Sequence, residues 1–186
     1  MKQQIDEHLH AVEQLKDSIP LLEGICSRII HCFKSGGKLY VLGNGGSAAD
    51  AQHIAAELVG RFKIDRRALP AIALTTDSSN LTAIGNDFGG EFIFSRQVEA
   101  LVTANDLVWA LSVSGTSPNI IAAVKAAKKK GSAVIGFTSI GGDALAEFCD
   151  ECFRAIHTSS DRVQEVHELA YHLICERIEF EYSHPS

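Results

Sequence analysis

Residues 41–57 read VLGNGGSAADAQHIAAE, an apolar run that passes through three glycines into an alanine-rich segment. Residues 38–42 predict a buried strand, and the small residues after the turn predict a helix that packs close to a sheet. Glycines allow backbone N–H groups to approach a ligand, and the first turn of a helix offers unpaired donors with a partial positive charge. The stretch therefore predicts a strand, a ligand-binding turn and a helix, in that order.

Two side chains with catalytic potential follow this turn. His53 and Glu57 are four residues apart, so they share one face of the predicted helix. An imidazole and a carboxylate can act as acid and base or bind a metal ion. A ligand-binding turn that leads directly into such a pair is typical of an active site.

Length and composition narrow the class of protein. The chain has 186 residues, 46% hydrophobic and 22% charged, which fits one soluble domain with a helical extension. The net charge of −6 argues against a general nucleic-acid binder. No apolar run approaches the roughly 20 residues that cross a bilayer, and the first residues have no signal-like apolar region. We expect a cytoplasmic protein without membrane or nucleic-acid partners.

The five cysteines do not suggest a disulfide framework, because their number is odd and the chain is not a small secreted domain. Cys149 and Cys152 have redox spacing but no second pair for a zinc ribbon. We interpret them as half-buried structural residues.

Apolar periodicity predicts helices that alternate with short strands. Residues 3–35 predict two helices separated at Pro20. The predicted strands are residues 38–42, 71–75, 107–112, 133–138 and 151–156. The predicted helices are residues 47–62, 78–84, 88–102, 118–130 and 162–182, with a turn at residues 85–87. This order indicates an α/β fold, a three-layer sandwich with a five-stranded parallel sheet and Trp109 in its core.

A second loop follows the third predicted strand. Residues 112–117 read SVSGTS, four hydroxyl side chains around a glycine, and Pro118 follows in the first helical turn. Hydroxyls and free helix N–H groups make a neutral phosphate site, although an ordinary turn capped by Ser117 is the alternative. No nucleotide P-loop motif occurs. The spacing Gly43-x-Gly45-x-x-Ala48 fits a dinucleotide site, but the acidic residue expected about 20 positions on, Asp65, precedes the next strand, so we set that site aside.

Together these motifs resemble the sugar-isomerase (SIS) domain family, and more closely its phosphoheptose isomerase branch. The segments that carry the resemblance are GNGGS at 43–47, QHIAAE at 52–57, ND at 86–87, SVSGTS at 112–117 and RVQEVH at 162–167. The resemblance covers nearly the whole chain. It implies a flavodoxin-like strand order, with N-terminal helices in residues 1–36 that serve oligomerisation and a SIS domain in residues 37–186.

The resemblance also implies a reaction and a set of partners. The reaction is conversion of sedoheptulose 7-phosphate to D-glycero-D-manno-heptose 7-phosphate through an enediol. This is the first step toward nucleotide-activated heptose for lipopolysaccharide or other surface glycans. The implied cofactor is one zinc ion per subunit, and the implied assembly is a homotetramer with active sites at subunit interfaces.

Individual roles follow from the same resemblance. The residues expected to contact substrate are Asn44, Gly45, Gly46, Glu57, Asn86, Asp87 and Gln164, with Ser112, Val113, Ser114 and Ser117 in the phosphate loop. The expected zinc ligands are His53, Glu57, Gln164 and His172. Glu57 is the expected base and His172 the expected acid. Thr116 departs from the family pattern, where an asparagine is expected, and we expect phosphate binding to tolerate this hydroxyl.

The chemistry independently requires such groups. Moving a proton between C1 and C2 of a sugar needs a base for the carbon acid, and an acid or a metal to stabilise the developing oxyanion. Gln164 and His172 are eight residues apart, so they differ by roughly 80° around a helix and can face one pocket. His167 lies between them, and we interpret it as a histidine on the helix surface.

Two other functions stay open at this point. One is a non-catalytic SIS protein of the replication-initiator-associating type, which lacks the carboxylate and histidine that stand here at Glu57 and His172. The other is an isomerase of another sugar phosphate, because the phosphate loop does not count carbons.

Overall fold

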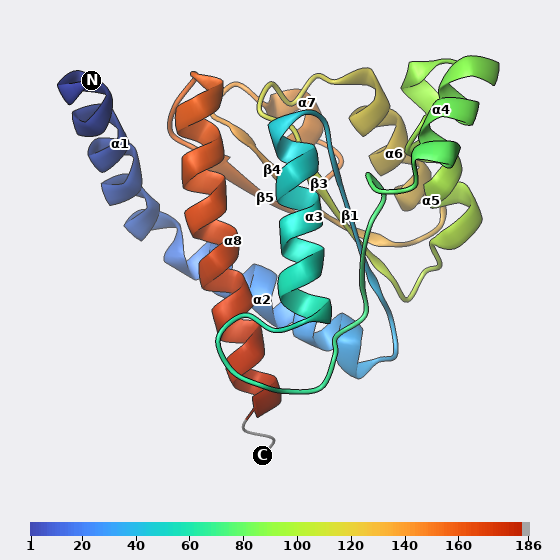
Figure 1. The fold of residues 1–186 in the computed structure, drawn as a ribbon, viewed down its shortest axis with the longest axis horizontal. Helices are drawn as coiled ribbons and strands as arrows, with labels where there is room; N and C mark the ends of the chain where they lie inside the picture. Colours follow the sequence, from blue (N-terminus) through green and yellow to red (C-terminus); the bar gives the residue numbers. More distant parts are fainter. Residues whose placement is uncertain (184–186) are drawn as a thin grey trace.

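The computed structural model describes residues 1–183 and has a parallel five-stranded sheet at its centre, with the strand order β2-β1-β3-β4-β5 (Figure 1). The strands are β1 (Leu39–Gly43), β2 (Ala71–Ala73), β3 (Leu107–Leu111), β4 (Ala133–Ser139) and β5 (Glu151–Ala155). The predicted fold class, strand number and flavodoxin-like order are confirmed. Because β2 lies at the edge beyond β1, the order reverses between β1 and β3, where such sheets bind ligands.

Helices cover both faces of the sheet. On one face α2 (Ile19–Lys34), α3 (Gly46–Val59) and α8 (Ser160–Ser183) pack in a core that includes Trp109, which is fully buried as predicted. On the other face α5 (Ser95–Leu101), α6 (Pro118–Lys129) and α7 (Asp143–Ala146) enclose a second core. Successive residues of β1 and β3 alternate between the two cores, so the centre of the sheet is apolar on both faces, whereas the edge strands β2 and β5 contribute only to the first core.

The helix α1 (Lys2–Gln14) projects away from the sheet (Figure 1). The short helix η1 (Leu15–Ser18) joins it to α2, so the break precedes Pro20, which lies in the first turn of α2. Ile5 and Leu9 of α1 remain 60% and 59% exposed, whereas Ile25 and Ile29 of α2 are fully buried. The two N-terminal helices therefore have different surroundings: α2 belongs to the core, and α1 offers an uncovered apolar side.

The segment between β2 and β3 differs from the prediction. The turn predicted at residues 85–87 is wrong, because α4 (Ser78–Asp87) continues through it. The single helix predicted at residues 88–102 is also wrong, because η2 (Gly90–Phe92) and α5 occupy that range separately. The chain turns at Gly89, whose φ of 107° requires glycine, and not at Gly85, which the helix accommodates.

No helix within residues 1–183 is both long and apolar enough to span a membrane.

Candidate active site

The loop between β1 and α3 approaches its own helix too closely for larger residues. A side chain on Gly43 would lie 2.5 Å from the backbone oxygen of Ser47, and Gly45 has a φ of 56°. Asn44 exchanges two hydrogen bonds with Asn119 at the start of α6, with N···O distances of 2.9 and 2.8 Å. This amide pair links the β1–α3 loop to α6, the helix that follows β3. It therefore lies at the point between β1 and β3 where the strand order reverses.

The loop after β3 is compact and rich in hydroxyls. The Ser112 and Ser117 side-chain oxygens are 3.3 Å apart, and Ser114 accepts a hydrogen bond from the Thr116 backbone N–H at 3.2 Å. Gly115 has a φ of 66°, and a side chain there would lie 2.4 Å from Gly142. The loop therefore closes only with glycine at this position, and its hydroxyls stand at the start of α6.

These two loops border a cavity of about 450 Å³ at the carboxyl ends of the strands. Eight predicted substrate residues line it: Asn44, Gly45, Gly46, Ser112, Val113, Ser114, Ser117 and Gln164. No lysine or arginine is among the lining residues, so hydroxyls, the amides of Asn44 and Gln164 and helix N–H groups are the polar groups that line it. The cavity suits a phosphate held by neutral donors.

The prediction missed five lining residues, which are Ser47, Leu111, Ser139, Thr158 and Ser160. Ser139 is the last residue of β4, and Thr158 and Ser160 follow β5 at the same edge of the sheet. The rule that ligands bind at the carboxyl ends of parallel strands, applied to all strands, would have found these hydroxyls.

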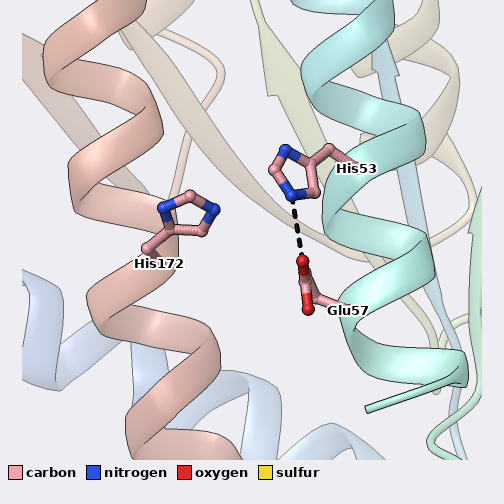
Figure 2. Close-up of side chains that lie close together, drawn as sticks. All are labelled: His53, Glu57 and His172. Carbon is pink, nitrogen blue, oxygen red and sulfur yellow. Dashed lines mark hydrogen bonds and ion pairs between the residues drawn. The ribbon is translucent and has the colours of Figure 1, made fainter. Parts of the chain in front are cut away.

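A second group of side chains lies on α3 and α8, the two helices whose first turns border the cavity. His53 and Glu57 on α3 face His172 on α8 (Figure 2). The Nε2 atom of His53 is 2.9 Å from Oε1 of Glu57, and the His53 and His172 rings are 5.0 Å apart. Ligand atoms of all three residues lie within 4.8 Å of one another, at half-buried positions. We call His53, Glu57 and His172 the His–Glu–His cluster; its nitrogen and carboxylate donors are those that zinc accepts.

Gln164 belongs to the cavity wall in this structure. A side chain added at Gly46 would lie 2.5 Å from the Gln164 amide, so the two residues pack in direct contact. Eight residues of helix, a rise of roughly 12 Å, separate Gln164 from His172. The amide is thus placed as a substrate contact, and its predicted role as a fourth metal ligand stays a prediction.

Asn86 and Asp87 are away from this cavity. They lie exposed at the end of α4, where the Asn86 amide donates to the Asp87 carboxylate at 2.8 Å. Asp87 borders a different cavity, beside Phe88 and Arg96. Within a single chain, the structure does not bring this predicted pair to the other substrate residues.

The prediction of a surface position for His167 is wrong, because its side chain is fully buried. Its Nε2–H group donates to the backbone oxygen of Thr138 at 3.1 Å, and the Thr138 hydroxyl donates to the oxygen of Val113 in the phosphate loop. His167 therefore joins α8 to β4 beneath that loop. Burial lowers its pKa to about 4.

This burial makes stability depend on pH. The unfolded state binds a proton on His167 below its ordinary pKa of about 6.5, and the folded state binds one only below about 4. The free energy of unfolding should therefore fall as the pH drops through this window. Between pH 7 and 5 we expect His167 to account for about 2 kcal/mol of loss. Urea unfolding of wild type and His167→Gln at both pH values measures it; an equal loss in both proteins would contradict the assignment.

Comparison with known proteins completes the description. The SIS domain family model matches residues 2–139. The phosphoheptose isomerase of Roseiflexus sp. is 49% identical over 165 residues, which cover 89% of this chain and 84% of that protein. The chain belongs to the SIS-domain phosphoheptose isomerase family.

Two further members of the phosphoheptose isomerase family are similar to this chain over most of its length. The Bradyrhizobium sp. (strain BTAi1) protein is 52% identical over 155 residues, 83% of this chain and 78% of that one. The solved phosphoheptose isomerase of Neisseria gonorrhoeae superposes with a TM-score of 0.91 at 38% identity and covers 96% of each chain. The residues matched by the family model include the two cavity loops, His53 and Glu57.

Proposed function

We propose that this protein is a ketose–aldose isomerase that converts sedoheptulose 7-phosphate to D-glycero-D-manno-heptose 7-phosphate. The observation that carries the proposal is a neutral phosphate cavity beside the His–Glu–His cluster, in a chain of the phosphoheptose isomerase family. α3 and α8 run side by side, so the cavity lies at their N-terminal ends and the cluster lies about two turns further along (Figure 1). A sugar phosphate has the same arrangement, with phosphate at one end and carbonyl at the other.

The proposed reaction follows from these positions. The hydroxyls of Ser112, Ser114 and Ser117 hold the phosphate, and Gln164 contacts the sugar. Glu57 removes the carbon-bound proton next to the carbonyl, and an enediol forms. His172 donates a proton to the developing oxyanion on O2. Glu57 then returns its proton to C2 while the O1 hydroxyl gives its proton back to His172, which leaves the C1 aldehyde.

The donor set of the cluster fits a divalent cation. We propose that His53, Glu57 and His172 hold one zinc ion per subunit, with Gln164 as a fourth ligand if its side chain turns from Gly46. When bound, zinc supplies a Lewis acid that polarises the substrate oxygens. His172 also stacks against Phe62, with ring centroids 5.3 Å apart, which fixes its orientation.

We expect His53→Ala to lose bound metal, because it removes one of three converging ligand atoms. Protein purified without chelators should contain about one zinc per chain, and the variant should contain little. His31→Ala, an exposed histidine on α2, is the control and should retain the metal. Equal metal content in wild type and His53→Ala would exclude this ligand set.

We further propose a homotetramer in which α1, within residues 1–36, forms part of the subunit contacts. The exposed Ile5 and Leu9 supply apolar surface for such contacts. In the assembly, Asn86 and Asp87 reach the cavity of a neighbouring subunit. The support is that α4 has no buried residue and that Phe88 and Phe92 beside it are 51% and 38% exposed.

Sedimentation should give about four times the 20.1 kDa chain mass. If the site is shared, inactive Asp87→Asn and inactive His172→Gln proteins should regain activity when their subunits are exchanged, because some sites then receive both natural residues. A fully active monomer, or no recovery in demonstrably mixed oligomers, would contradict this arrangement.

The direct test of the function is incubation with sedoheptulose 7-phosphate and detection of an aldoheptose phosphate. Fructose 6-phosphate in a parallel reaction tests whether turnover depends on the number of carbons in the sugar. Turnover of the hexose phosphate alone would favour an isomerase of another sugar phosphate. Turnover of neither would favour a non-catalytic SIS protein, which no observation supports at present because Glu57 and His172 are both in place.

We place this reaction at the start of heptose supply for lipopolysaccharide or another surface glycan. We also propose the cytoplasm as its compartment, since all five cysteines are free thiols, as in a reducing environment. Cys149 and Cys152 are half-buried, as predicted.

A further inference from the structure

One buried hydroxyl lies directly behind the His–Glu–His cluster. The Tyr171 oxygen is 2.9 Å from Nδ1 of His53, and the two rings meet edge to face with centroids 5.5 Å apart. The Tyr171 side chain is fully buried, although it precedes the half-exposed His172. No motif in the sequence marks this tyrosine.

A carboxylate lies near the same hydroxyl. Asp50, one turn before His53 on α3, lies near the Tyr171 hydroxyl; burial and Glu168 raise the pKa of its carboxyl to about 6, and Tyr171 acts against that shift. Its Oδ2 atom is buried and has no hydrogen-bond partner among residues 1–183, so the carboxylate can accept the Tyr171 O–H. Tyr171, His53 and Glu57 thus form a continuous chain of polar contacts, and the Asp50 carboxylate lies near its outer end.

The two nitrogens of His53 have different partners, and this decides their roles. Nε2 faces Glu57 at 2.9 Å and is therefore the atom within the cluster, while Nδ1 faces Tyr171. If Nε2 offers its lone pair to a cation, the ring proton must be on Nδ1 and needs an acceptor. The Tyr171 oxygen can accept this proton while its own hydrogen is donated to Asp50.

The same hydroxyl also serves the ion-free protein. There Nε2–H can donate to Glu57, and Nδ1 then accepts a hydrogen bond from Tyr171. A hydroxyl can donate or accept, so it satisfies both tautomers of a buried imidazole. A phenylalanine would fill the same space and satisfy neither.

We propose that Tyr171, supported by Asp50, is a positioning residue that holds the proton on Nδ1 of His53 and so presents Nε2 to a divalent cation. The inference deepens the proposed function and rests on its metal site. Outer partners of this kind typically change metal affinity by about 10–100-fold when they are removed.

The test uses zinc itself and does not depend on turnover. Ion-free wild type and Tyr171→Phe are titrated with Zn²⁺ against a chromophoric chelator, and we expect about 10–100-fold weaker binding in the variant. Tyr182→Phe is the matched control, because this tyrosine lies on the same helix but donates to the backbone oxygen of Ile30 at 3.4 Å. The zinc affinity of this variant should equal that of the wild type. Asp50→Asn should weaken binding in the same direction, and it carries the test if Tyr171→Phe does not fold.

A spectroscopic measurement separates positioning from general loss of structure. Nitrogen-15 NMR of the zinc-loaded wild type should show the His53 proton on Nδ1, and this signal should be lost or exchange-broadened in Tyr171→Phe. Unchanged zinc affinity together with an unchanged His53 signal would overturn this inference alone. A wild type that binds no zinc would overturn the proposed metal site as well.

Discussion

Glu57→Gln should lower kcat by about 10²–10⁴-fold, the usual contribution of a positioned general base. The amide keeps the shape of the side chain but accepts a proton poorly. The carboxylate is 18% exposed and contacts His53 at 2.9 Å, so it is the group in the cluster best placed to act as base. Steady-state rates with sedoheptulose 7-phosphate measure the loss.

Two comparisons make this result specific. His172→Gln should lose activity to a similar degree, whereas Ser114→Ala should mainly raise KM, because it removes a phosphate contact. Metal content has to be measured on each variant, since Glu57 is also a proposed ligand. Solvent deuterium should enter the wild-type product at C2 if an enediol forms. Near-normal turnover by zinc-replete Glu57→Gln would refute the role of base.

Glu179→Ala should lower the free energy of unfolding by about 3–5 kcal/mol, the cost of leaving a buried ionic group without its partner. Glu179 is 1% exposed and accepts hydrogen bonds from the backbone N–H groups of Phe62, Lys63 and Ile64 at 2.6–2.9 Å. It also faces the buried Arg66 guanidinium at 3.7 Å. Burial acts to raise its pKa, but these donors outweigh it and hold the pKa below the usual range.

The same carboxylate supports the active site from a distance. Arg66, which it faces, donates to the backbone oxygens of Glu57 and Leu58 at 2.6 and 2.8 Å, at the end of α3. Loss of Glu179 should therefore loosen the turn that carries the proposed base. Differential scanning calorimetry or urea unfolding measures the stability.

A neighbouring ion pair supplies the control. Glu176 is on the same helix and binds Lys63 of the same loop at 2.8 Å, but both side chains are more than half exposed. Glu176→Ala should change stability by less than about 1 kcal/mol, because exposed ion pairs contribute little. Similar losses of unfolding free energy in Glu179→Ala and Glu176→Ala would show that the burial of Glu179 does not explain its contribution to stability.

The order of strands and helices, the two loops and most of the cavity could be predicted from the sequence alone. These features depend on residues close together in the chain. A glycine turn after an apolar run, and hydroxyls at the start of a helix, have nearly the same geometry in any fold of this class. The pairing of His53 with Glu57 depends only on the helical repeat, and the structure has it as predicted.

Tertiary structure decided which remote side chains meet. His167 and His172 share one helix, yet the packing of α8 against β4 buries the first and leaves the second at the cluster. The same packing put Tyr171 against His53, 118 residues away in sequence. It also left Asn86 and Asp87 outside the cavity of their own chain. Periodicity gives the face of a helix but not its neighbour, because the neighbour is fixed by how all the apolar faces are buried together.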